Sequence, residues 1–160
     1  MRYKFPDPED QASLAHTFQA TTDKFSERPF LHFENEMWTY GHTNKAANSL
    51  ARYLVSTGVK HSDRVVLFME NRPSFVITLL ALNKIGAIGV LINTSLTGDP
   101  LMHCINSSDS VKCIVGAERA DALEDVLDQI NITKQEDFLW AEDTAEFSLP
   151  DLASDLNAQL

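Results

Sequence analysis

The sequence is poor in glycine, and the placement of its few glycines excludes the usual phosphate loops. Its 160 residues contain six glycines, which form neither a G-x-G-x-x-G nor a G-x-x-x-x-G-K-[ST] pattern, and none follows Gly116. Nucleotide-binding α/β proteins commonly hold phosphates on a glycine-rich turn at a helix N-terminus. The stretch after Gly116 therefore contains no conventional glycine-rich phosphate loop.

Cysteine is also scarce, since Cys104 and Cys113 are the only two in the sequence. This excludes a dense disulfide framework and makes a reducing compartment the default. Five histidines are scattered, and no two of them stand four residues apart, which argues against a metal site. A Cys–His nucleophile pair stays open for either cysteine, but a buried, small apolar role is favoured for both. No G-x-S-x-G element of a serine hydrolase occurs.

Positive charge is nearly absent from the last quarter of the chain. Residues 1–117 contain 11 Lys/Arg and 11 Asp/Glu, whereas residues 118–160 contain 2 and 12, so all of the net charge of −10 falls in the second segment. An acidic surface repels phosphate backbones, so we expect no nucleic acid partner. We interpret residues 1–117 as a partial N-terminal α/β domain and residues 118–160 as its acidic continuation, a helix plus a connector.

No apolar run has the character of a membrane span. The longest, residues 75–92, carries Asn83 and Lys84 at its centre. A central lysine costs about 2.5–3.5 kcal/mol on insertion scales. The first residues do not resemble a secretory signal. We therefore expect a cytoplasmic protein and leave peripheral membrane association open.

Apolar periodicity predicts an alternation of helices and strands. Helices are expected over residues 13–25, 43–57, 73–85, 100–107 and 120–130, and Pro150 is expected to open another. Strands are expected over residues 30–34, 37–40, 65–69, 88–92, 111–115 and 138–140. The alternation after residue 43 predicts an α/β fold with an open, mainly parallel sheet flanked by helices, incomplete at its C-terminus. The runs at 65–69 and 88–92 predict strands buried on both faces.

Three segments within residues 37–116 resemble adenylate-forming, or AMP-binding, enzymes in order and spacing. They are Trp38-Thr39-Tyr40 with the helix 46–51 and Gly58, then the stretch DRVVLFMENRP at 63–73, and LNKIGA, LINTSL and HCI within 82–105. The last segment is similar to the fatty acid transport protein branch, the very-long-chain acyl-CoA synthetases. Ser74 departs from the family, which often carries an acidic residue there.

The resemblance implies a first subdomain of a fatty-acyl-CoA ligase. In such enzymes ATP and a fatty acid give an acyl-adenylate, and the CoA thiol then displaces AMP, with Mg²⁺, ATP and CoA as cofactors. The family's Ser/Thr/Gly-rich phosphate loop, ribose-binding aspartate and acyl-transfer lysine have no counterpart in this sequence. We therefore predict that the chain is inactive alone and needs the remainder of the synthetase domain. The alternative is a non-catalytic binding or regulatory module derived from the family.

Topology supplies the predicted site. Ligands of open parallel sheets bind at the carboxyl ends of the strands. The predicted strand 88–92 ends at Asn93-Thr94-Ser95, so these three residues are the predicted cleft-facing, substrate-binding loop. The alternative is that Asn93 only caps the loop by hydrogen bonds to its backbone. Lys84 is expected on an exposed helix face rather than at a phosphate, and no residue is assigned a catalytic or metal-binding role.

Overall fold

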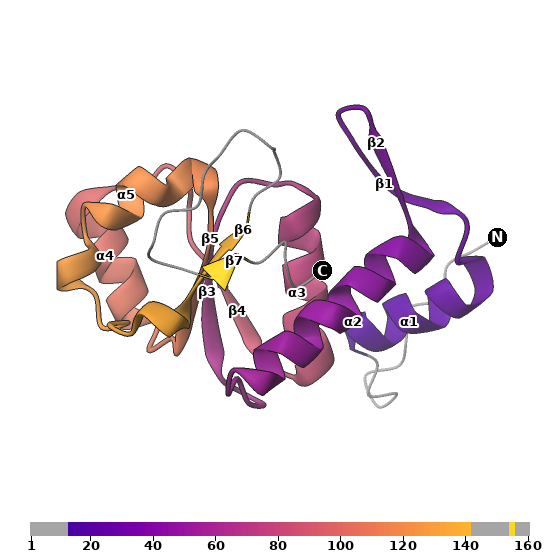
Figure 1. Cartoon of the computed structure of the whole chain (residues 1–160), viewed down its shortest axis with the longest axis horizontal. Helices are drawn as coiled ribbons and strands as arrows, with labels where there is room; N and C mark the ends of the chain where they lie inside the picture. The colour runs from indigo at the N-terminus through magenta and orange to yellow at the C-terminus, as the bar shows by residue number, and fades with distance from the viewer. Residues whose placement is uncertain (1–12, 142–153, 156–160) are drawn as a thin grey trace.

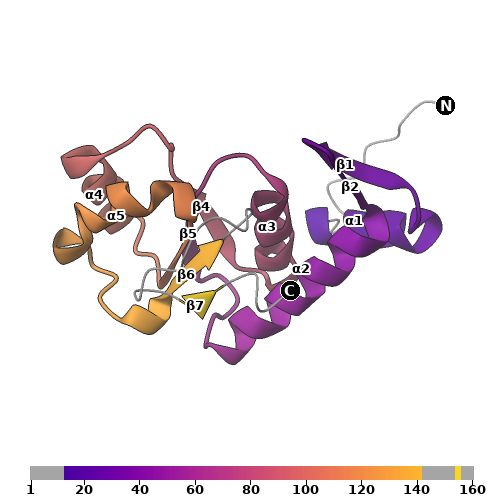
Figure 2. The same ribbon diagram turned by 45° about the horizontal axis from the view of Figure 1, so that its top comes forward.

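The structure, a computed structural model, describes residues 13–141 and 154–155. Its centre is a parallel sheet of five strands in the order β4-β3-β5-β6-β7, with helices on both faces (Figures 1 and 2). The strands are β3 (Arg64–Phe68), β4 (Ile88–Leu91), β5 (Lys112–Gly116), β6 (Phe138–Ala141) and β7 (Ser154–Asp155). The predicted α/β fold with a parallel sheet is confirmed.

A helix and a hairpin precede the sheet. They are α1 (Leu14–Phe25), β1 (Pro29–Phe33) and β2 (Glu36–Thr39), and the two strands pair antiparallel. The helix begins where predicted, because Ser13 Oγ accepts the backbone N–H of His16 at 3.1 Å. The predicted apolar stripe of α1 is only partly right: Phe18 is buried, but Leu14 and Phe25 are 52% and 41% exposed.

Two long helices, α2 (Tyr40–Ser56) and α3 (Pro73–Ile85), cover one face of the sheet. α2 begins three residues before the prediction, because Thr39 Oγ accepts the backbone N–H of His42 at 3.1 Å. Gly86 ends α3 with a φ of 72°, the left-handed conformation that glycine adopts without strain. Leu50 and Leu54 of α2 are fully buried in this core.

Shorter helices, α4 (Gly98–Ser107) and α5 (Ala120–Glu124), cover the opposite face. The predicted continuous helix over residues 120–130 is wrong, because α5 stops at Glu124 and a 3₁₀ turn follows at Leu127–Gln129. The apolar spacing still has its effect, since Leu123, Val126 and Ile130 are buried in the core of this face.

The two ends of the sheet also differ from the sequence expectation. β4 was predicted to be buried on both faces, but it lies at the edge of the sheet, where Ile88 and Leu91 are 49% and 55% exposed. The helix predicted after Pro150 falls mostly outside the described residues. Within it, Ser154–Asp155 form the strand β7 beside β6 instead of a helical turn.

Candidate functional site

The loop predicted to face a cleft lies directly after β4, at the carboxyl end of the sheet. Asn93 Oδ1 accepts hydrogen bonds from the backbone N–H of Ser95 at 3.0 Å and from its hydroxyl at 2.6 Å. The backbone N–H of Leu96 donates to the carbonyl of Asn93 at 3.1 Å. Asn93 and Ser95 are exposed and Thr94 is half-buried. Asn93 thus has the capping role that the sequence left as an alternative, and it fixes the shape of a loop at the carboxyl edge of the sheet.

Four charged side chains join the carboxyl ends of β3 and β5, and we name them the charged clasp: Glu70, Arg72, Glu118 and Arg119. Glu118 Oε1 accepts the backbone N–H of Glu70 at 2.8 Å, and Glu118 Oε2 lies 3.3 Å from Arg72 Nη1. Arg119 Nη2 forms a hydrogen-bonded ion pair with Glu70 Oε1. The Arg72 and Glu118 side chains are each only 19% exposed, so the clasp is shielded from much of the solvent.

The fold brings the clasp together because β3 and β5 are parallel neighbours. Phe68 is in register with Val115, so the segments that follow these strands leave the sheet side by side. A Cβ at Gly116 would lie 2.3 Å from the Glu118 carboxylate oxygens, so glycine leaves room for that side chain to fold back. Sequence reasoning missed the clasp. The available signal was an acid close to an arginine after each of two neighbouring strands.

The cysteines give no support to a nucleophile. Cys113 is fully buried in β5, and burial raises the pKa of its thiol to about 12, so the thiol stays protonated at neutral pH. Cys104 is half-buried on α4. The neighbouring His103 ring lies 3.5 Å from the Ser107 hydroxyl. Among residues 13–141 and 154–155, no group of three or more His, Cys, Asp or Glu side chains is arranged to hold a metal ion.

Lys84 differs from its predicted position on an exposed helix face. Its Nζ donates a hydrogen bond to Gln19 Oε1 at 3.2 Å, which ties α3 to α1. Burial lowers the pKa of Lys84, and the nearby charge of Asp23 partly opposes that effect. The lysine therefore has a structural contact between two helices.

The sequence matches the AMP-binding enzyme family over residues 18–157. The chain belongs to that family. This AMP-binding chain is 32% identical to long-chain fatty acid transport protein 6 of Mus musculus over 111 residues, which cover 69% of the chain and 18% of that protein. The resemblance carried by residues 37–116 is thereby confirmed.

A second curated relative is also similar in sequence, and a solved structure shares the fold. The medium/long-chain-fatty-acid–CoA ligase FadD6 of Mycobacterium tuberculosis is 32% identical over 116 residues, 72% of this chain and 19% of that protein. The structure of the anthranilate CoA ligase AuaEII in complex with anthranoyl-AMP superimposes with a TM-score of 0.75 at 18% identity, over 81% of this chain and 25% of that one. The AMP-binding chain thus spans 18% and 19% of the two curated relatives.

None of the helices within residues 13–141 combines the length and apolar character that crossing a bilayer requires.

Proposed function

We propose that this AMP-binding chain forms the first part of an ATP-dependent ligase that activates long- or very-long-chain fatty acids as CoA thioesters through an acyl-adenylate. The observation that carries the proposal is the family match over residues 18–157. The matched residues form a parallel sheet, and the Asn93–Ser95 loop and the charged clasp lie at its carboxyl edge. A fatty acid transport protein, a fatty-acid–CoA ligase and a ligase bound to anthranoyl-AMP support it as relatives.

The residues present do not fit a complete ATP site, so the 160 residues have no ligase activity alone. The cations of the clasp at the carboxyl edge, Arg72 and Arg119, are already paired with Glu118 and Glu70. The sequence offers no glycine-rich loop to surround the phosphates. In the intact ligase, residues beyond this chain would provide most of the contacts to ATP, Mg²⁺ and CoA. This chain would form one wall of the cleft.

The Asn93–Ser95 loop is our proposed part of that wall. It follows a strand of the parallel sheet, and ligands of such sheets bind beyond the carboxyl ends. Thr94 is the half-buried residue of the three, while the side chains of Asn93 and Ser95 bond to each other. A bulky Thr94→Trp change in the intact ligase should therefore raise the KM for the fatty acid and leave the KM for ATP nearly unchanged. An equal rise in both constants would contradict this placement.

The central test is an assay of fatty-acid-dependent pyrophosphate release by the purified chain with ATP, Mg²⁺, CoA and a long-chain fatty acid. We expect no release above the rate without enzyme, and no saturable heat when ATP is titrated into the chain. Acyl-CoA formation by the chain alone would contradict the proposal that these 160 residues have no ligase activity without the rest of the synthetase.

A second test distinguishes part of an enzyme from a non-catalytic module. The chain is mixed with a fragment of the mycobacterial ligase that lacks the 116 matched residues. Acyl-CoA formation in the mixture, absent from either component, would support the ligase. Stable association without any recovered activity would favour a regulatory or binding module.

A further inference from the structure

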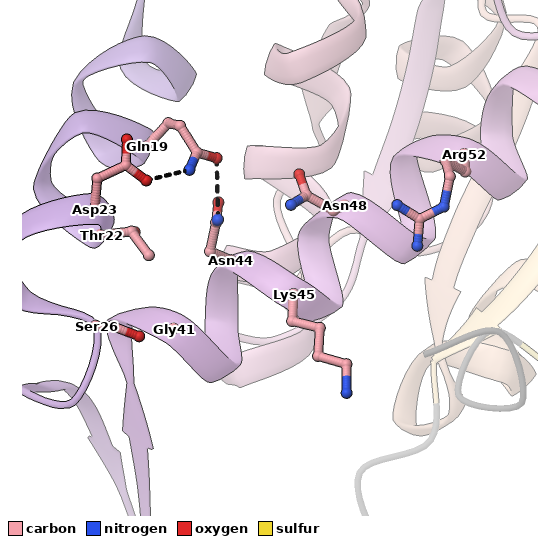
Figure 3. A pocket seen from close by; sticks show the side chains of 9 residues that line it. All are labelled: Gln19, Thr22, Asp23, Ser26, Gly41, Asn44, Lys45, Asn48 and Arg52. Carbon is pink, nitrogen blue, oxygen red and sulfur yellow. Dashed lines mark hydrogen bonds between the residues drawn. The ribbon is translucent and has the colours of Figure 1, made fainter.

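A polar hollow of about 400 Å³ lies between α1 and α2 (Figure 3). Its lining contains polar side chains and a glycine, and no apolar side chain. Amides come from both helices, the hydroxyls come from α1 and its C-cap residue, and two cations, Lys45 and Arg52, come from α2. This composition favours a charged or hydroxylated ligand over an apolar one.

The two cations are free to bind an anion. Lys45 and Arg52 are seven residues apart, two turns along α2, with Asn48 between them in the sequence. In Figure 3 the Lys45 side chain extends away from Asn48 and Arg52. Within the described ranges, the ion pairs involve neither residue, and Arg52 makes its hydrogen bond to the neutral Ser49 hydroxyl at 3.1 Å. The sequences of α2 and α3 contain no Asp or Glu. A cationic surface therefore exists on a chain whose net charge is −10.

A hydrogen-bond network holds the walls of the hollow in place. Gln19 Oε1 accepts from Asn44 Nδ2 at 3.0 Å and from Lys84 Nζ at 3.2 Å, and Gln19 Nε2 donates to Asp23 Oδ1 at 2.8 Å (Figure 3). Asn44 is 7% exposed, and its Oδ1 has no hydrogen-bond partner among residues 13–141 and 154–155. A buried acceptor without a donor carries a desolvation cost that a bound hydroxyl would relieve.

A second hollow of about 390 Å³ adjoins the first and shares Asn48 and Arg52 with it. It extends to Lys84 and Ile85 of α3. Arg52 thus lines both hollows, whereas Lys45 lines only the first and Lys84 only the second. Asp23 is the acid of the first hollow and lies on α1, so it disfavours an anion on that side and favours one against α2.

We propose that this hollow binds the phosphate group of a small hydroxylated phosphate ester, such as glycerol 3-phosphate or the same group at the surface of a lipid. The Arg52 guanidinium and the Lys45 ammonium hold the phosphate oxygens, since charge-assisted hydrogen bonds to phosphate are the strongest of this class. The Asn48 amide, one turn from each cation along α2, donates to the same anion. The site shares no residue with the Asn93–Ser95 loop or with the charged clasp.

The first experiment follows the backbone amide signals of the ¹⁵N-labelled chain by NMR as sn-glycerol 3-phosphate is added. Saturable shifts confined to the amides of α1 and α2 are expected, and glycerol at the same concentrations should produce none. Added salt should weaken the binding by screening. Absence of saturable shifts with glycerol 3-phosphate, or equal shifts with glycerol, would overturn the site in its soluble form.

A near-isosteric variant tests the assignment of the anion. Asn48→Asp adds one negative charge to the lining of the hollow and should weaken glycerol 3-phosphate binding about tenfold or more, because a charged hydrogen bond is worth roughly 1.5–3 kcal/mol. Asn35→Asp adds the same charge in the exposed hairpin turn and should bind like the parent chain. Arg52→Gln gives a second test if Asn48→Asp fails to fold. Unchanged binding in a folded Asn48→Asp or Arg52→Gln chain would overturn the proposal.

A third arm distinguishes the source of the phosphate. The chain is sedimented with vesicles of phosphatidylcholine alone and with vesicles that also contain phosphatidic acid. Binding to the second kind only, lost in Asn48→Asp, would assign the site to a lipid headgroup, whereas glycerol 3-phosphate binding without vesicle binding would assign it to a free ester. Failure of both ligands would end the proposal.

Discussion

The two faces of the central sheet are covered in different ways. On one face, α2 and α3 run for 17 and 13 residues without interruption. On the other, α4 has 10 residues and α5 only 5, with 3₁₀ turns on either side of α5. Both faces nonetheless bury their apolar side chains, because Leu54 is fully buried and Leu123 is 3% exposed. On these two faces, apolar spacing therefore decides which side chains are buried, but it does not decide whether the helix stays regular.

Charge spacing accounts for the difference. α2 carries no carboxylate, so none of its i,i+4 positions are repulsive. In the segment of α5, the pairs Asp121–Asp125 and Glu124–Asp128 stand four residues apart, and all four side chains are exposed. Like charges at this spacing destabilise a helix, and aspartate has a low helix propensity. The segment that follows Glu124 therefore does not continue the α-helix, although its apolar side chains stay buried.

The largest effect should come from equal deletions on the two faces. Leu54→Ala on the long-helix face should lower the free energy of unfolding by about 4 kcal/mol, because its rigid surroundings leave a cavity. Leu123→Ala should cost about 2.5 kcal/mol, since the short, irregular segment around it can close part of the space. Urea unfolding of both variants measures the difference. Equal losses would mean that irregular backbone does not make this face more adaptable.

The charged clasp fastens the start of the irregular segment to β3, so its removal should act mainly on the second face. Glu118→Gln removes the charge that faces Arg72 and should cost about 2 kcal/mol, less than a fully buried pair because the side chains are partly exposed. The matched control is the exposed pair of Arg64 and Asp109, 3.7 Å apart, where Asp109→Asn should cost less than about 0.5 kcal/mol. A loss of the same size in both variants would deny the clasp a special role.

The sequence predicted those features of the fold that are determined by residues close to one another along the chain. The helix over 73–85 and its end at Gly86 were correct, because apolar periodicity and a left-handed glycine act within a few residues. The edge position of β4 was missed, since strand order depends on pairings between distant segments. The clasp was missed for the same reason: Glu70 and Glu118 meet only after β3 and β5 have paired. The contact of Lys84 with Gln19 likewise joins two residues that are 65 positions apart in the sequence.

The two faces also differ in the space around a glycine at a helix end. Gly86 after α3 and Gly98 at the start of α4 have φ values of 72° and 55°. A Cβ at Gly86 would lie 2.3 Å from His61 Cδ2, whereas a Cβ at Gly98 meets nothing within 4 Å. Gly98→Ala should therefore cost about 1 kcal/mol from backbone strain alone, and Gly86→Ala about 1.5 kcal/mol because His61 must also move. Thermal unfolding that ranks them in the opposite order would contradict the steric argument.

The smallest expected effect tests the cause of the broken helix. Asp125→Lys replaces a repulsive i,i+4 pair by an acid placed four residues before a lysine, the favourable order in a helix. It should stabilise the chain by about 0.5 kcal/mol and increase the circular dichroism at the helical minimum. Glu27→Lys makes the same change of charge in an exposed segment outside any helix, so it separates local repulsion from the relief of the net charge of −10. If both variants gain equally, the long-range charge of the chain accounts for the gain, and another cause must explain why α5 stops at Glu124.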